Sequence, residues 1–167
     1  MAFDFGKIKA PKTEEAIIDP VGIFQKNKGK VSDKTINDLW LGQGDALREW
    51  HSHRDKDDLA IVLNTGAGKT LIGLLIAQSL VNETKGKVLY ACGSIQLIEQ
   101  TREKAEGYGL SVTTYYHSKY SNDLYRQGKA ACLTTYQAIF NGKSVFGRQD
   151  IDAIIFDDSH TAQGMIK

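Results

Sequence analysis

The stretch Leu63-Asn64-Thr65-Gly66-Ala67-Gly68-Lys69-Thr70 decides the fold of this 167-residue chain. It follows an apolar run at 59–63 and opens an apolar-periodic segment at 71–81, which predicts a strand, a glycine loop and a helix. Glycine at positions 66 and 68 permits left-handed backbone and leaves room for an anion. The amides of the turn and of the helix N-terminus would point at that anion, so the pattern predicts a phosphate-binding loop.

The chemistry of such a loop assigns its residues. Lys69 would reach the β- and γ-phosphates of a nucleotide, and the Thr70 hydroxyl would hold Mg²⁺. The expected nucleotide-binding residues are Thr65, Gly66, Ala67, Gly68, Lys69 and Thr70. The strict pattern G-x-x-x-x-G-K-[ST] has glycine where this chain has Leu63, so only its compact form is present. The alternative, a plain glycine turn beside a surface lysine, is disfavoured by the flanking strand and helix patterns.

Composition sets looser bounds. Hydrophobic residues make up 41% of the chain and charged residues 25%, which are ordinary values for one globular domain. The net charge of +1 argues neither for nor against nucleic acid. Cys92 and Cys132 lie in or beside apolar runs, so we expect reduced core cysteines in a cytoplasmic protein. We find no signal-peptide pattern and no segment long enough to span a bilayer.

Apolar runs and helical patterns alternate along the chain. The predicted strands lie at 59–63, 87–92, 111–116, 130–134 and 153–156. The predicted helices lie at 69–81 and 95–106, with shorter candidates at 122–127 and 136–140. This alternation predicts a parallel, doubly wound α/β sheet that binds its ligand at the carboxyl ends of the strands.

The N-terminal part is less regular. Residues 1–32 contain both prolines and many lysines, and we interpret them as an arm or docking segment, with 16–24 as the part that would dock. Residues 33–54 predict two helical pieces, the second starting at Gln43. We therefore expect one domain over residues 33–167.

A second motif follows the last predicted strand. The apolar run 153–156 leads into Asp157-Asp158-Ser159-His160, which puts carboxylates at the carboxyl end of a strand. Asp157 could hold Mg²⁺ beside the phosphate loop, and Asp158 could orient or deprotonate an attacking water. The alternative is an acidic turn without a ligand.

Together, T-G-A-G-K-T and D-D-S-H resemble motifs I and II of the DEAD/DEAH-box, superfamily 2 helicases. The resemblance implies a three-layer RecA-like domain, with a mostly parallel sheet flanked by helices, that hydrolyses ATP with Mg²⁺. It implies catalytic roles for Lys69, Asp157 and Asp158, and it makes His160 the link to a second motor domain. The family usually has Glu where this chain has Asp158, and a carboxylate misplaced by about one bond length can slow hydrolysis ~10²-fold.

Three weaker matches follow the same family order. Gln43 matches the glutamine that reads adenine, since its amide offers a donor and an acceptor. Gly93, Ser94 and Gln100 match motif Ia, and Thr134 and Thr135 match the following strand-end motif. Both motifs contact the nucleic-acid backbone, of DNA or RNA, without reading sequence. The plain alternative for each is a capped helix start. Tyrosines in 115–125 either stack bases or cover a core edge.

The family continues beyond motif II with another strand and a second RecA-like domain in cis, whereas only seven residues follow His160 here. We therefore expect a first motor domain that binds Mg-ATP weakly, turns it over slowly and does not unwind duplexes alone. Two rivals stay open. One is a nucleotide-gated switch or assembly module that binds ATP and a partner, and the other is a P-loop ATPase or kinase outside the helicases.

Overall fold

The computed structural model describes residues 14–31 and 36–158. Its helices, in chain order, are α1 (Pro20–Lys28), α2 (Leu41–Ser52), α3 (Lys69–Thr84), α4 (Ile95–Gly107), α5 (Tyr136–Phe140) and the 3₁₀ helix η1 (Phe146–Arg148). Its strands are β1 (Val88–Cys92), β2 (Val112–Tyr116), β3 (Lys119–Tyr120), β4 (Ala131–Thr135) and β5 (Ala153–Phe156).

The strands form one sheet in the order β3-β2-β4-β1-β5. Every pair is parallel except β2 with β3, and Leu89 of β1 lies between Cys132 of β4 and Ile154 of β5. All five residues of β1 are buried, as expected for a strand covered on both faces. The mostly parallel α/β sheet predicted from the sequence is confirmed.

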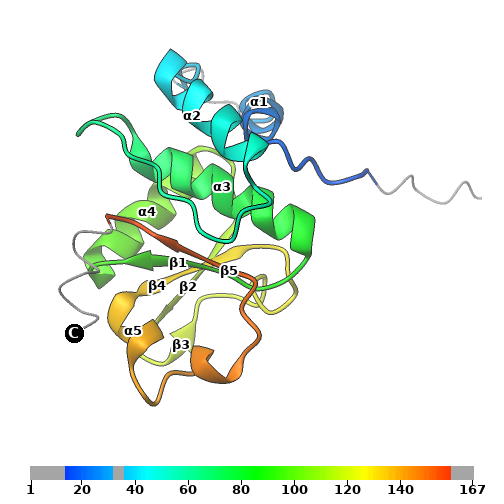
Figure 1. Cartoon of the computed structure of the whole chain (residues 1–167). Coiled ribbons are helices and arrows are strands. Elements are labelled where there is room, and N and C mark those ends of the chain that lie inside the picture. Colours follow the sequence, from blue (N-terminus) through cyan, green and yellow to red (C-terminus); the bar gives the residue numbers. More distant parts are fainter. Residues whose placement is uncertain (1–13, 32–35, 159–167) are drawn as a thin grey trace, which may run out of the picture.

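Helices cover the sheet unevenly. α3 and α4 lie on one face, α5 packs against β4 and β1 on the other, and α1 and α2 lie outside α3 (Figure 1). α3 is therefore enclosed by α1 and α2 on its outer side and by the sheet on its inner side. Leu71, Leu74, Leu75 and Val81 of α3 are all buried, because a helix that is apolar on most sides needs cover on most sides.

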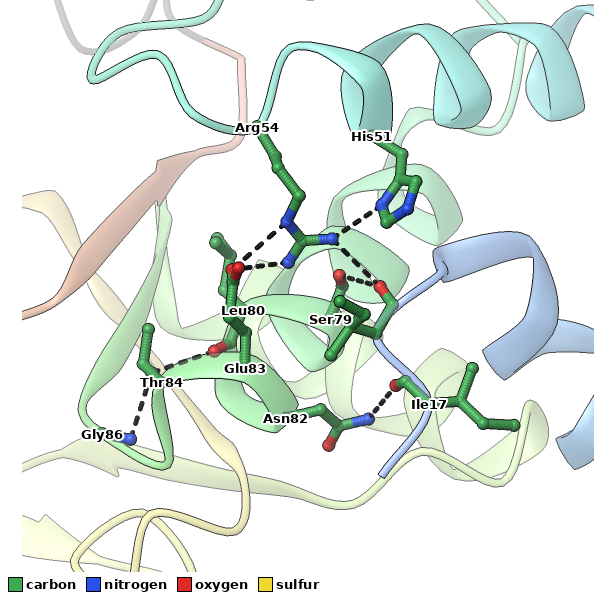
Figure 2. Close-up of polar contacts among 10 residues, drawn as sticks. Ile17, His51, Arg54, Ser79, Leu80, Asn82, Glu83, Thr84 and Gly86 are labelled. Carbon is green, nitrogen blue, oxygen red and sulfur yellow. Dashed lines mark hydrogen bonds and ion pairs between the residues drawn. The ribbon is translucent and has the colours of Figure 1, made fainter. Parts of the chain in front are cut away.

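The N-terminal segment docks on this helical layer. Ile23 and Phe24 of α1 are buried in the main core. Figure 2 shows Arg54, which follows the C-cap of α2, directed toward Glu83 of α3, the carbonyl of Ile18 and the ring of His51. The Arg54 Nη2 to Glu83 Oε2 distance is 2.6 Å, and Asn82 donates a 2.7 Å bond to the carbonyl of Ile17. The described part of the predicted docking segment thus packs on this domain.

One predicted strand is wrong. Residues 59–63, before the phosphate loop, have no strand structure, and Leu59, Ile61 and Val62 are 42%, 39% and 93% exposed. A strand needs a neighbour that pairs its amides and covers its side chains. Within the described residues, β5 pairs with β1 alone, so 59–63 does not pair with the outer edge of β5 and stays outside the sheet.

One predicted helix is also absent, and another is missing from the described part of its range. At 122–127 the chain forms turns, because the Asn122 side chain accepts from the amide of Leu124 at 3.0 Å and Gly128, at φ 66°, closes the turn. Residues 36–40 form no helix, while 32–35 lie outside the described residues. α2 begins two residues before Gln43, because the Gln43 side chain accepts from the amide of Trp40 at 3.0 Å. No described helix is long and apolar enough to cross a membrane.

Candidate nucleotide site and nucleic-acid groove

The phosphate loop adopts a left-handed conformation at both of its glycines. Gly66 has φ 83° and Gly68 has φ 71°, and the amide of Ala67 donates to the carbonyl of Asn64 at 3.1 Å. Gly68 caps α3, which begins at Lys69. Lys69 is exposed and Thr70 is half-buried, so both side chains stand at the helix N-terminus, where an anion is favoured.

Gln43 is built into this loop. It is 8% exposed, and its Nε2 donates to the carbonyl of Ala67 at 3.0 Å while its Oε1 accepts from Trp40. A Cβ atom at position 68 would lie 2.3 Å from the Gln43 Nε2. The glutamine therefore supports the loop backbone at a point that only glycine permits. Its predicted contact with adenine stays a prediction.

Asp157 stands at the carboxyl end of β5. Its amide continues the sheet by donating to the carbonyl of Ala91 at 3.1 Å. Burial raises the pKa of the Asp157 carboxyl, as does the charge of Asp158, while a hydrogen bond from Tyr90 and the charges of Lys104 and Lys69 lower it.

Asp158 is exposed and adopts a left-handed backbone conformation, with φ 54°. Asp tolerates this region better than most residues, because its short polar side chain bonds locally. The hydroxyl of Tyr136 donates to the backbone carbonyl of Asp157 and lies 3.3 Å from that of Asp158. His160 lies outside the described residues, so its predicted role stays a prediction.

The donor chemistry of the site fits Mg²⁺. Thr70 offers a hydroxyl and Asp157 a carboxylate, which are the hard oxygen ligands that this ion prefers. The described residues contain no group of three His, Cys, Asp or Glu side chains that could hold a metal by themselves. An ion bound here would therefore take most of its ligands from water and from nucleotide phosphates, which matches the ordinary behaviour of Mg²⁺.

A groove of about 980 Å³ opens at the carboxyl ends of β1, β2 and β4. Gly93, Ser94 and Thr135 line it, as do residues of α5 and of the loop after it. Ser94 caps α4 by accepting from Leu97 at 3.2 Å, and Thr135 caps α5 by accepting from Ala138 at 3.1 Å. Among the described residues that line the groove there is one lysine, Lys143, and no carboxylate. Its electrostatics suit an anionic chain.

The other predicted contacts lie elsewhere. Gln100 is exposed on α4 and does not line the groove. Thr134 is fully buried, and its hydroxyl donates to the carbonyl of Tyr115 at 2.9 Å, so this side chain is occupied within the sheet. Tyr115 and Tyr125 are buried core residues, which favours the core-edge alternative for both. Two more aromatic side chains of that stretch line the groove: the half-buried Tyr116, whose hydroxyl donates to Glu99 Oε1 at 3.0 Å, and His117, at the tip of the β2–β3 hairpin.

Comparisons with known proteins identify the family of the chain. The sequence profile described as "Type III restriction enzyme, res subunit" matches residues 37–166. The chain belongs to this family. A Methanocaldococcus jannaschii protein, provisionally named an ATP-dependent RNA helicase, is 31% identical over 113 residues, which is 62% of this chain and 14% of that protein. The chain thus spans about one-seventh of the curated relative that it matches.

The fold has a solved counterpart. The crystal structure of the UvsW helicase from bacteriophage T4 matches 85% of this chain and 51% of its own, with a TM-score of 0.64 and 22% identity. At that identity the likeness concerns the fold, which is that of a helicase RecA-like domain. With the family match, it confirms the resemblance to the N-terminal motor domain of superfamily 2 helicases.

Sequence reasoning missed three residues of these sites. Tyr90 reaches Asp157 from β1, Tyr136 reaches the same residue from α5, and Lys143 is the lysine of the groove. Tyr136 directly follows the strand-end motif at Thr135, and that adjacency was the available signal. Nothing local in the sequence marks Tyr90 or Lys143, because their roles depend on tertiary packing.

Proposed function

We propose that this chain is the ATP-binding first motor domain of a nucleic-acid-dependent ATPase, a helicase or translocase of superfamily 2. The observation that carries the proposal is the contact between α3, which begins at Lys69 of motif I, and β5, which ends directly before Asp157 of motif II. Thr65 to Thr70 would hold the phosphates of ATP, and Thr70 and Asp157 would hold Mg²⁺, which supplies charge neutralisation when bound. Gln43, next to the loop, would read the adenine after giving up its present bonds to Trp40 and Ala67.

In the complete ATPase, Lys69 would stabilise the charge that develops on the γ-phosphate, and Asp158 would orient the attacking water and take its proton. The short side chain and left-handed backbone of Asp158 place its carboxylate differently from that of a glutamate. An arginine supplied by another domain can contribute ~10³–10⁵ in turnover in related sites. This chain alone would therefore hydrolyse ATP slowly and would not unwind duplexes.

Nucleic acid would lie in the groove. Gly93, Ser94 and Thr135 would contact the backbone of a strand from the starts of α4 and α5, and Lys143 would pair with a phosphate. These contacts are indifferent to base identity, so the proposal includes both DNA and RNA. A nucleotide-gated switch that binds a partner without moving along a strand is the second candidate, and the short Asp158 favours it.

The test is binding of a fluorescent 12-nucleotide single strand, measured by anisotropy at several salt concentrations, for DNA and RNA separately. The proposal predicts saturable binding that weakens as salt increases, because released counterions drive phosphate contacts. A matched duplex serves as the comparison. A folded chain that binds neither strand at low salt would contradict the nucleic-acid part and leave the nucleotide switch.

A further inference from the structure

We propose that Tyr136 is a positioning residue that couples a strand in the groove to the nucleotide-site residue Asp157. The inference rests on the proposed function, since it requires both ligands. Its basis is one contact: the Tyr136 hydroxyl donates to the backbone carbonyl of Asp157. Tyr136 is also the first residue of α5, directly after Thr135, and lines the groove with it. One side chain thus joins the floor of the groove to the backbone of motif II.

The packing around Tyr136 makes this link stiff. The ring is 1% exposed and stacks on Phe156 of β5, with centroids 5.9 Å apart and planes 7° apart. Phe140, at the other end of α5, also stacks on Phe156, at 6.0 Å and 11°. Phe156 immediately precedes Asp157. Phe140 and Phe156 are themselves 45% and 40% exposed, so the link depends on the buried Tyr136 ring and on its hydroxyl, which holds the carbonyl of Asp157. Through these two contacts a shift of α5 would be passed to the end of β5.

The groove side of α5 is where a strand would act. Thr135 and Gln137, on either side of Tyr136, line the groove, and Lys143 follows in the loop after α5. α5 has only five residues, so its position depends on its contacts rather than on its own helical stability. A strand held by these residues would fix α5, and through Tyr136 it would fix the backbone of Asp157 and Asp158.

The consequence is positive coupling between the two ligands. A strand that fixes α5 removes part of the ordering cost of the nucleotide site, so Mg-ATP would bind more tightly in its presence. Linkage requires the nucleotide to tighten strand binding by the same factor. Couplings of this kind are commonly about 5-fold or more.

The test measures a ratio. The affinity for Mg²⁺ with a non-hydrolysable ATP analogue is determined by calorimetry, with and without a saturating 12-nucleotide single strand. For the unmodified chain we expect the strand to tighten analogue binding about 5-fold or more. Tyr136→Phe keeps the ring and its stacking but removes the hydroxyl, and we expect its ratio to fall close to one. If a substitution changes the affinity for the analogue equally with and without the strand, that change cancels from the ratio, because both affinities are measured on the same variant.

Tyr125→Phe is the matched control. Tyr125 is also a buried tyrosine, but its hydroxyl donates to Gln149 Oε1 at 2.9 Å, away from both proposed sites. Its ratio should equal that of the unmodified chain. Should the unmodified chain bind both ligands with a ratio of one, or should Tyr136→Phe keep the full ratio, the coupling is refuted while the proposed function stands. Failure of the unmodified chain to bind the strand refutes both the coupling and the nucleic-acid part of the proposed function.

A second measurement needs no variant, so it holds even where Tyr136→Phe does not fold. Hydrogen–deuterium exchange of the peptide that contains Asp157 and Asp158 is followed with and without the strand, in the absence of nucleotide. Slower exchange with the strand is the expected result. Unchanged exchange at saturating strand would overturn the coupling.

Discussion

The side-chain amide of Gln43 donates a 3.0 Å hydrogen bond to the carbonyl of Ala67, and so joins α2 to the phosphate loop. The contact needs glycine at the next position, because a Cβ at 68 would lie 2.3 Å from Gln43 Nε2. The nucleotide loop of this chain is thus held by a residue that lies well before it in the sequence.

Gly68→Ala should destabilise the protein more than Gly66→Ala. Both positions have positive φ, so each alanine should cost about 1–2 kcal/mol of backbone strain. A Cβ at position 66 meets nothing within 4 Å, whereas that at 68 meets Gln43 and should cost a further ~1–3 kcal/mol. Chemical denaturation measures both. In a Gln43→Ala background the extra cost should disappear, and its persistence there would show that the glutamine is not its cause.

Asp157→Asn should make the free protein more stable near neutral pH while abolishing Mg²⁺-dependent nucleotide binding. Burial raises the folded-state pKa of Asp157, so its charge opposes folding above that pKa. As pH falls through the raised pKa toward the unfolded value of about 3.9, the aspartate gains a proton and the difference should shrink. Thermal melts from pH 7 to 4 measure this difference in stability between the variant and the unmodified chain, with Asp55→Asn, at an exposed position, as the control. An asparagine variant less stable at every pH would contradict this electrostatic account.

Lys143→Ala should reduce the salt dependence of strand binding. Since Lys143 is the lysine among the described groove residues, its loss should lower the slope of log affinity against log salt by about 0.7. Anisotropy titrations at four salt concentrations measure the slope. Lys129→Ala removes an exposed lysine that does not line the groove and should leave the slope unchanged. Equal slopes for all three proteins would place the strand elsewhere.

Asp158→Glu distinguishes the two candidate functions. Glutamate restores the reach of the family carboxylate, so a motor should gain turnover, up to ~10²-fold. The φ of 54° at this position opposes the change somewhat, because glutamate adopts left-handed backbone less readily. Phosphate release with and without a strand is the measurement. No gain in a variant that still binds Mg-ATP would favour the nucleotide-gated switch.

The sequence predicted the parts of the fold whose burial is local. The sequence correctly placed four strands and two helices: β1, β2, β4, β5, α3 and α4. Buried strands appear in the sequence as apolar runs, and long helices appear as apolar residues at helical spacing. The run at 59–63 has the same apolar pattern but pairs with no described strand. An apolar run does not by itself specify which strand it pairs with. The β3 hairpin escaped prediction because its turn uses His117 and Ser118 at positive φ, not glycine.

The site residues that could be predicted are likewise those that belong to short local motifs. Motif residues such as Lys69 and Asp157 could be named because loop chemistry depends on short spacings. Thr134 could not be separated from Thr135, since alternation along one strand decides which hydroxyl is buried in the sheet and which caps α5. Tyr136 stacks on a residue from a strand later in the chain, and only the folded chain shows that pairing.

The most direct test of the central claim is a calorimetric titration with Mg-ATP, comparing the unmodified chain with Lys69→Ala and Lys129→Ala. Both lysines are exposed, so neither change should disturb the fold, which melting curves check. We predict saturable binding that Lys69→Ala weakens about 10-fold or more, as expected for loss of a charged phosphate contact, and that Lys129→Ala leaves unchanged. Equal affinity in all three proteins, or no binding by a folded chain, would contradict the nucleotide site.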